Sequence, residues 1–541
     1  MKSKELKILI FFVLAFSIFT TSLRTSSPLF HFGDSGQNYK ILNNTFEFGY
    51  PYNDIWPSIY QLAFIDQIGF RDVDEEYFKD NLFKVENDEP KKNNHLFFHS
   101  YLILYLLAPL VSFVSAPIVL NFLNCFSFIS LLGLAYYHLR KKNFNIFEST
   151  LVTFSISLFP GWSQSFFAQP FYDSFFRPLS YILCFFLFYK ITNISSKLLD
   201  KTDSNAKFNI KVFLLFLIFF TLSIIIVEKI SIYLFLLLSS FIFLYFFRIN
   251  NSYKFLIISL IICSFSYYFV LTKYVLINPY YSSSATSLNL SILFDTLFNF
   301  FRNKYMLNQT LYFIVALLPL LIFITLGRLK NLLIFLLLLS PNIFGSIGGA
   351  EKTGFYTHYH TLYLGFLFFF FVESFSSKRG ELLLKKIGVT SISIFIILYY
   401  LFVNVTSTGV TIGFNHNNYF KHFTELIKTN SLYYKTRDDL TKIIPSDSKI
   451  ILSEKAMPYL YDYNNTVFFP YDLDDSEYII YNYSIVDGLK IPHLLMPVID
   501  TDYHIGVRKI LLDKIIEHGF NYDYPLYDNS NLLVLKKENK K

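Results

Sequence analysis

The sequence predicts a membrane-embedded all-α bundle of the kind that carries a separate α/β domain at its C-terminus. Of its 541 residues, 53% are hydrophobic and only 16% are charged, a balance too apolar for a soluble globular protein. The apolar residues occur in runs, and about 20 such residues in a helix cross the hydrocarbon core of a bilayer. After residue 405 the chain becomes polar and rich in Asp and Tyr, which indicates a domain outside the lipid.

Eleven apolar segments are the expected transmembrane helices, and the first of them follows a basic start. A signal peptide has a similar beginning, but this segment lacks a convincing small-x-small cleavage site, so we interpret it as an uncleaved span. The segments cover residues 6–23, 117–138, 147–161, 175–193, 210–227, 229–247, 254–274, 310–327, 331–347, 360–376 and 386–405.

The basic residues predict the orientation of these spans, because short Lys- and Arg-rich connections stay in the cytoplasm. With a cytoplasmic N-terminus, every short basic connection falls on the cytoplasmic side only if the apolar residues 96–114 do not span. We therefore interpret 96–114, which contains Pro109, as an interfacial helix. The alternative is that 96–114 spans and a weaker segment, such as 147–161, does not.

This topology places the large loop 24–95, the loops 162–174 and 275–309, the turn 345–357 and everything after Asn404 on the outer face. The expected domains are a transmembrane domain over 1–405, with its first outer loop 24–95, and an extracytoplasmic α/β domain over 406–541. The predicted location is the cytoplasmic (inner) membrane, crossed many times. Glu228 and Lys229 are expected at the tip of a tight outer hairpin.

The tail alternates strand-like and helix-like segments, as a small α/β domain does. Strands are expected at 449–453, 466–469, 478–481 and 532–536, and helices near 418–443 and 505–518. Pro445, Ser446 and Asp447 form a turn signal immediately before the first of these strands.

Several classes of protein are disfavoured by composition. The net charge of +7 comes from clusters at the ends of apolar runs, so we expect no nucleic-acid partner. The three cysteines lie inside apolar runs, which argues against a disulfide framework or a cysteine zinc site. The sequence contains no Gly-rich nucleotide loop, nucleophile elbow or HExxH motif, which disfavours an NTPase of the cytosolic type.

Asp34 is the candidate catalytic residue of the first outer loop. It follows the first span by about ten residues and lies between Gly33 and Gly36, where glycines allow a close approach of the backbone to a ligand. A carboxylate at the membrane surface can act as a general base toward an acceptor hydroxyl. The competing interpretation is a turn or helix-cap residue. The acidic run 72–76 looks like a metal-binding motif, but a solvated helix face is the simpler explanation.

A second candidate segment, 351–360, lies immediately before a late span and combines Lys352, His358 and His360 with several aromatics. Its cations would bind a phosphate or diphosphate, and the alternative is a set of interfacial anchors. A metal site on the two histidines would need further ligands that the sequence does not identify, so no metal ligand is assigned. Arg177 can contact phosphate with two nitrogens or pair with Asp173, four residues before it.

Several spaced segments resemble a family of predicted prokaryotic multi-pass membrane proteins of unknown function, which looks like a branch of the GT-C glycosyltransferase superfamily. They are the run His95-Leu96-Phe97-Phe98-His99-Ser100 leading into Leu107-Ala108-Pro109, the helix ending at Arg140-Lys141-Lys142, Tyr356-Thr357-His358-Tyr359-His360, and the tail from Ile444-Pro445-Ser446-Asp447 to Leu532-Leu533-Val534-Leu535.

The resemblance implies a GT-C-like fold and transfer of a sugar from a polyprenyl-phosphate carrier, with an acidic residue of the first outer loop as base. Asp34 is the matching residue. It is followed by Ser35 rather than a second acid, which leaves metal dependence open; the cofactor is unknown, and a divalent cation would be compatible.

The leading interpretation is a membrane glycosyltransferase of the cell envelope that uses a polyprenyl-phosphate-linked donor at the outer face, with Asp34 as base and Arg177, Lys352, His358 and His360 near the donor phosphate. Its partners would be membrane lipid, this donor and an acceptor that the sequence does not identify. A transporter or lipid flippase would carry ionisable residues at mid-membrane depth, and these are scarce. A non-catalytic envelope assembly protein is the third class.

Overall fold

The computed structural model describes residues 3–31, 34–55, 57–58, 93–168, 170–191, 209–276, 300–344, 360–375, 377–406, 409–413, 420–493, 502–529 and 532–538. Their contacts group the chain into two compact units. The first contains residues 1–22, 99–103 and 120–425, and the second contains 23–98, 104–119 and 426–541. The sequence analysis predicts two folding domains that meet at residue 406, and this boundary stays a prediction.

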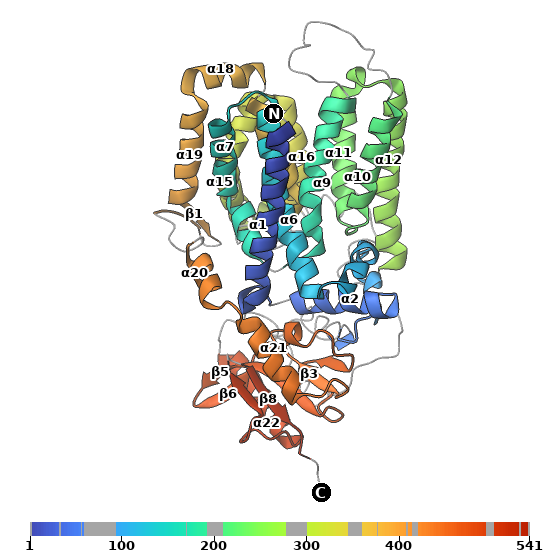
Figure 1. The fold of residues 1–541 in the computed structure, drawn as a ribbon, viewed down its shortest axis with the longest axis vertical. Helices are drawn as coiled ribbons and strands as arrows, with labels where there is room; N and C mark the ends of the chain where they lie inside the picture. Colours follow the sequence, from blue (N-terminus) through green and yellow to red (C-terminus); the bar gives the residue numbers. More distant parts are fainter. Residues whose placement is uncertain are drawn as a thin grey trace. The chain divides into compact units, whose positions relative to one another are not determined.

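The first unit is a bundle of apolar helices, shown in Figure 1, and each of the eleven predicted segments overlaps one of them. Within the described residues, six helices are long and apolar enough to cross a membrane. They are α1 (Ser3–Ser26), α6 (Ala116–Lys141), α9 with its flanking turns η5 and η6 (Tyr172–Ile191), α11 with η7 (Ile230–Arg248), α12 with η8 (Asn251–Val275) and α15 (Lys304–Gly327). These helices support a membrane-embedded protein.

The other five predicted spans coincide with shorter apolar helices of 10–17 residues. They are α7 (Ile146–Ser157), α10 (Ile210–Ile224), α16 (Leu329–Phe344), α17 (Thr361–Phe375) and α19 (Val389–Phe402). Eleven spans are therefore not established, because a helix of 15 residues covers about 22 Å and a bilayer core is about 30 Å thick. The apolar runs predict the positions of these helices correctly but not their lengths.

The bundle is built around α17, in which every residue is buried. Helix α9 (Phe176–Phe186) packs closely against it. A Cβ atom at Gly365 would lie 2.0 Å from the Ser180 hydroxyl oxygen and 2.2 Å from the Arg177 carbonyl oxygen. Only a glycine therefore allows this approach of the two backbones, and small residues commonly have this role where helices meet in membranes.

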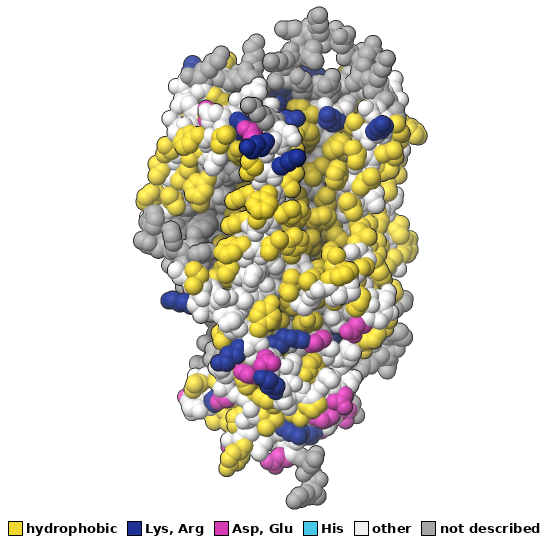
Figure 2. Space-filling view, viewed as in Figure 1, with side chains coloured by type: hydrophobic (Ala, Val, Ile, Leu, Met, Phe, Trp, Pro, Cys, Tyr) yellow, Lys and Arg dark blue, Asp and Glu magenta, His cyan; other side chains and the backbone are white. Residues whose placement is uncertain are grey.

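The two ends of the bundle can be recognised from ion pairs between helix termini. Glu5 at the start of α1 and Arg140 at the end of α6 form an ion pair of 3.0 Å, so these helices run in opposite directions. The chain between them therefore leaves and re-enters the bundle at the same end, as expected if residues 96–114 do not span. On the face shown in Figure 2, hydrophobic side chains cover most of the bundle's length, and Lys and Arg side chains gather near the end that holds the N-terminus.

The prediction of one continuous interfacial helix over 96–114 is wrong. This region consists of the short pieces η3 (His95–Phe97), α5 (Leu104–Leu107) and η4 (Ala108–Ser112). Pro109 lies in the first turn of η4, where its missing N–H is tolerated, but it prevents α5 from continuing as a regular helix. Large apolar side chains of this region are exposed, which suits contact with lipid headgroups and acyl chains: Tyr105, Leu106, Leu110, Phe113 and Val114.

The second unit combines part of the first loop with the tail. Helix α2 (Ser35–Phe48) packs on α5 and η4, and on the turn η11 (Met457–Tyr459) of the tail. Ile55 from the loop lies in the same hydrophobic core as the tail residues Leu440, Ile450 and Ile480. The unit therefore has a core built from segments that are 400 residues apart.

The tail contains the predicted strands and helices, arranged around a mixed sheet (Figure 1). The strand order is β4-β3-β5-β8-β7, with β6 also paired to β5. Strands β3 and β4 are parallel, as are β3 and β5, whereas β8 is antiparallel to both β5 and β7.

The elements of the tail are α20 (Phe420–Lys428), α21 (Leu432–Ile443), β3 (Ile450–Leu452), β4 (Thr466–Phe468), β5 (Tyr478–Val486), β6 (Leu489–Pro492), α22 (Asp502–Glu517), β7 (Tyr527–Asn529) and β8 (Leu532–Lys536). Before them, α18 (Lys378–Ile387) and the hairpin β1 (Val403–Thr406) and β2 (Gly409–Ile412) flank α19.

Candidate functional site

Asp34 is an exposed residue of the second unit and immediately precedes α2. Its backbone carbonyl accepts a hydrogen bond from Asn38, which starts the helix, while its side chain makes no capping bond to the backbone. The Gln37 amide donates weakly to the Asp34 carboxylate, at 3.4 Å. The helix-cap interpretation therefore holds for the backbone but not for the side chain, which faces solvent.

The glycine beside Asp34 serves a packing purpose that the sequence did not reveal. A Cβ at Gly36 would lie 2.6 Å from Cβ of Met457 and 2.8 Å from the backbone nitrogen of Pro458. The tail therefore packs directly against the backbone of Gly36. Gly33 lies outside the described residues.

Buried polar contacts fasten α2 to the tail. The Lys40 ammonium, 1% exposed, lies 2.9 Å from Oδ1 of Asp54 and donates to the Tyr463 carbonyl. Oδ2 of Asp54 accepts from the backbone N–H and the hydroxyl of Thr466, at 2.8 and 2.9 Å. Asp54, a further acidic residue of the loop 24–95, therefore helps to hold α2 on the tail.

His31 adds an aromatic contact to the same assembly. Its ring stacks on Tyr433 with centroids 3.8 Å apart, and its nitrogens contact the Tyr39 hydroxyl at 3.0 Å and the Thr25 carbonyl at 3.1 Å. Burial lowers the pKa of His31 to about 3, and the charge of Arg24 acts in the same direction. His31 is therefore a neutral structural residue near physiological pH.

A second carboxyl lies near Asp34, and the sequence analysis missed it. Glu454 follows β3, and burial raises the pKa of its carboxyl to about 7, with a further rise from the negative charge of Asp34 and an opposing effect from Lys455. A carboxyl that keeps its proton near neutrality next to an exposed carboxylate is typical of acid–base sites. No sequence signal could have joined the two residues, because 420 positions separate them.

Arg177 lies in the first turn of α9 and is 1% exposed. Its guanidinium donates to Oδ1 of Asn124 at 3.2 Å and to the Ser174 carbonyl at 3.3 Å, and its central carbon lies 3.4 Å from the centre of the Phe128 ring. In this conformation the guanidinium is turned into the bundle, so contact with a donor phosphate would require it to be uncovered.

Of the second predicted segment, the structure describes only His360, which is buried and contacts the Tyr363 hydroxyl through Nδ1 at 3.0 Å. Lys352 and His358 lie outside the described residues. His360 immediately precedes α17, and Arg177 is on α9, so the two lie on closely packed elements of the first unit. Asp34 belongs to the second unit, and the expectation that it acts together with His360 at the donor phosphate stays a prediction.

A histidine–carboxylate pair marks one end of the bundle. Glu228, expected as part of a hairpin tip, lies between α10 and α11 but is completely buried. Its two oxygens contact Nδ1 of His99 and the backbone N–H of Ser100, each at 3.0 Å. Asp173 interacts electrostatically with Glu228, His99 and Lys229. The glutamate therefore holds the segment 99–103 on the bundle.

A second buried group lies within the bundle, on helices predicted to span. Glu373 of α17 accepts a hydrogen bond from the Tyr189 hydroxyl and lies 3.5 Å from Nε2 of His138 and 3.7 Å from the Lys142 ammonium. Tyr189 belongs to the π-helical turn η6 (Leu187–Ile191), a feature common at functional sites. Glu373 is the single acidic residue of the predicted span 360–376. An acid inside an apolar run indicates a buried polar group, and the sequence analysis did not use this signal.

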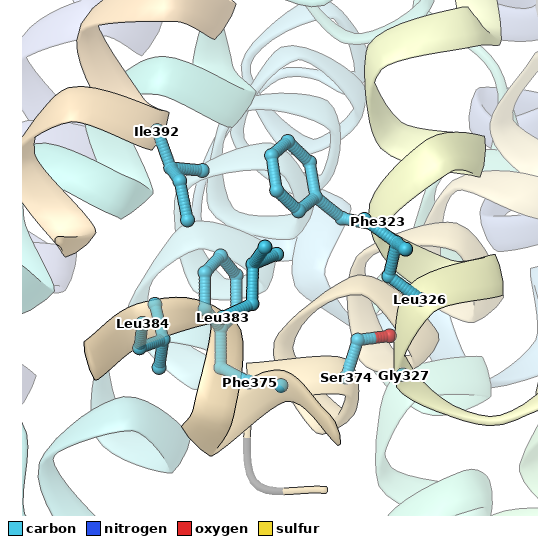
Figure 3. Close-up of a pocket in the computed structure, with 9 residues that line it drawn as sticks. Phe323, Leu326, Gly327, Ser374, Phe375, Leu383, Leu384 and Ile392 are labelled. Atoms are coloured by element: carbon cyan, nitrogen blue, oxygen red, sulfur yellow. The ribbon is translucent and has the colours of Figure 1, made fainter. Parts of the chain in front are cut away.

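A pocket of the bundle is almost entirely apolar (Figure 3). Its lining residues are Phe323, Leu326, Gly327, Ser374, Phe375, Gly380, Leu383, Leu384 and Ile392. The Ser374 hydroxyl donates to the Phe370 carbonyl within its own helix at 2.7 Å, so the pocket lacks the polar groups that a sugar needs. Within the described part of the chain, no three His, Cys, Asp or Glu side chains are grouped so that they could hold a metal ion.

No protein-family model matches the chain, and no curated protein matches it.

Proposed function

We propose that the protein is a membrane glycosyltransferase of the GT-C type, which moves a sugar from a polyprenyl-phosphate-linked donor to an acceptor at the outer face of the cytoplasmic membrane. The observation that carries this proposal is the setting of Asp34. It is an exposed carboxylate at the start of a firmly anchored helix, eight residues after α1, a helix long enough to span a membrane. A base in this setting can reach an acceptor hydroxyl next to a lipid-linked donor.

Asp34 would accept the proton of the acceptor hydroxyl while the oxygen forms a bond to the sugar carbon. The bond from that carbon to the carrier phosphate breaks, and its electron pair leaves with the phosphate. Arg177, Lys352, His358 and His360 are the proposed cations for this phosphate. The anchored backbone of α2 favours this role, because a general base needs a fixed position.

The proposed topology has eleven spans, a cytoplasmic N-terminus and an extracytoplasmic tail. Short helices are compatible with it where protein rather than lipid surrounds them, as for the completely buried α17. Labelling of Lys449→Cys in a background without the three native cysteines tests the orientation. A membrane-impermeant maleimide should label intact cells, and labelling only after permeabilisation would reverse the proposed side.

Transfer is tested with the full chain in membrane vesicles from the source cells, which supply the acceptor. The probes are radiolabelled glucose, mannose and N-acetylglucosamine, each linked to undecaprenyl phosphate. Asp34→Asn should lower transfer of the accepted sugar by about 100- to 10,000-fold. Glu47→Gln is the matched control, because Glu47 is an exposed carboxylate on the same helix and already accepts from Asn43 at 2.9 Å.

Undiminished transfer by Asp34→Asn, in protein that inserts normally, would remove Asp34 as the base. Absence of transfer from every probe in the wild-type vesicles would favour the other classes, a transporter or flippase or a non-catalytic envelope protein. The buried group around Glu373 is the feature that a transporter would use, since ionisable residues inside a membrane are costly and commonly functional.

A further inference from the structure

A buried carboxylate orients a partly exposed histidine in the first unit. Glu228 is completely buried in the turn between α10 and α11, and its Oε1 lies 3.0 Å from Nδ1 of His99. Its Oε2 accepts the backbone N–H of Ser100, also at 3.0 Å. Because a carboxylate only accepts hydrogen bonds, Nδ1 of His99 carries the ring proton, and the lone pair of the neutral ring is on Nε2.

Aromatic contacts fix this imidazole without burying it. The ring of Tyr101 lies beside that of His99, with centroids 5.2 Å apart, and Tyr101 is in turn 4.9 Å from the ring of Tyr172. The His99 side chain is nevertheless 21% exposed, whereas Glu228 is 0% exposed. A histidine that is held by a buried carboxylate and still reaches solvent is in the arrangement that proteins use for acid–base work and for binding anions.

The pair belongs to the outer side of the proposed topology. Glu228 precedes α11 with η7 (Ile230–Arg248), which is long enough to cross a membrane and carries the basic Arg248 at its other end. If that basic end is cytoplasmic, Glu228 and His99 are on the opposite face, where a lipid-linked donor would present its phosphate. Lys229 follows Glu228 in the chain and is half-buried, so the same turn carries a second cation.

We propose that His99 and Lys229 bind the phosphate of the lipid-linked donor, and that Glu228 is the positioning residue of this histidine. The inference rests on the proposed function and adds a phosphate site to it. When the phosphate binds, Nε2 of His99 takes up a proton from solvent and donates a hydrogen bond to a phosphate oxygen. The buried Glu228 carboxylate balances the positive charge of the ring. No covalent bond to the substrate is made or broken by these residues.

Chemical modification tests the histidine without an activity assay. Diethyl pyrocarbonate reacts with the lone pair of an imidazole nitrogen, and mass spectrometry of peptides gives its rate at each histidine of the full chain in detergent. Undecaprenyl phosphate should slow the reaction of His99 by about 10-fold when its concentration is ten times its Kd. His518 is the matched control, because it is 19% exposed and lies 3.4 Å from Asp474 in the second unit. Its rate should not change.

Two further probes identify the chemistry that is recognised. Undecaprenol, which lacks the phosphate, should give no protection of His99, and protection by it would overturn a phosphate site. Inorganic phosphate at the same concentration should protect less than undecaprenyl phosphate. Equal protection by inorganic phosphate would overturn the assignment to a lipid-linked donor. Absence of protection by both phosphates would overturn the proposal as a whole.

Glu228→Gln separates a positioning role from a merely structural one. The amide of a glutamine would donate to Nδ1 of His99, so the ring proton would move to Nε2 and occupy the lone pair there. His99 should therefore react with diethyl pyrocarbonate more slowly than in the wild type. A loosened structural contact would expose the ring and make the reaction faster, and that result would overturn the positioning role.

The transfer assay distinguishes failure of this inference from failure of the proposed function. His99→Ala should lower kcat/KM for the donor by about 10- to 100-fold, the effect of losing one hydrogen bond to a charged group. If Asp34→Asn abolishes transfer but His99→Ala transfers as the wild type does, the inference fails and the proposed function stands. If undecaprenyl phosphate protects His99 but wild-type vesicles transfer none of the labelled sugars, the proposed function fails and the phosphate site remains.

Discussion

Asp54→Ala should destabilise the second unit more than an Asp→Ala substitution at an exposed position of the same unit. The change removes the carboxylate that faces the buried Lys40 ammonium at 2.9 Å, and it removes both hydrogen bonds to Thr466. Lys40 is 1% exposed and keeps only its contact with the Tyr463 carbonyl among those described above. The variant therefore leaves a charge inside the protein without its counter-ion.

The expected cost follows from the burial of the pair. Removing one partner of a buried ion pair typically costs about 3–5 kcal/mol, because the remaining charge stays out of water. Asp462→Ala is the matched control, since Asp462 is 38% exposed and pairs with Arg437 at 2.6 Å. An exposed pair contributes only about 0–1 kcal/mol, so the two variants should be clearly distinguished.

Hydrogen–deuterium exchange of the full chain in detergent measures the effect locally. The amides that join β3 to β4 should exchange at least about 100-fold faster in Asp54→Ala, the factor that corresponds to about 3 kcal/mol in a rapid opening equilibrium. The double variant Lys40→Met, Asp54→Leu should recover much of this protection, because an apolar pair leaves no buried charge. Equal protection in Asp54→Ala and Asp462→Ala would refute the reasoning.

Two further substitutions test the second unit and the bundle. The pKa of His31 is about 3 in the folded protein and 6.5 in the unfolded chain, so only the unfolded chain binds a proton there as the pH falls below 6.5. Acidification from pH 7 to 5 should therefore remove ~2 kcal/mol of stability. Thermal melts in detergent measure this loss. His31→Phe should lack that acid-dependent loss, and an unchanged pH dependence would contradict a neutral buried imidazole. Gly365→Ala should lower the melting temperature of the bundle, at an overpacking cost of about 1–3 kcal/mol, because its Cβ would meet the Arg177 carbonyl at 2.2 Å. Gly413→Ala, with nothing within 4 Å of the added carbon, is the control, and equal melting of the two variants would argue against the close helix contact.

Much of the fold was predictable because it depends on local pattern. Apolar runs formed helices at all eleven expected positions, and the alternation after residue 418 predicted four strands and two helical regions that the tail contains. Region 96–114 shows where local pattern was insufficient, since Pro109 and the packing of α2 divide it into short turns.

The candidate site was predictable only in part. Asp34 was identified from its place after the first span, and the structure shows an exposed side chain there. Arg177 and His360 were chosen as surface cations, but both are buried. A charged residue near the end of an apolar run can face lipid headgroups or the interior of the bundle, and its position along the chain does not distinguish the two.

The sequence by itself determined that the chain forms apolar helices followed by an α/β tail, because hydrophobic periodicity and turn residues act over a few neighbouring positions. Only the tertiary structure decided that Lys40 contacts Tyr463, that Glu454 lies near Asp34 and that Glu373 contacts His138 and Tyr189. These partners are separated by 184 to 423 residues along the chain. They meet because burying apolar surface brings distant segments together, and a buried polar group must then find its partner among whatever that packing provides.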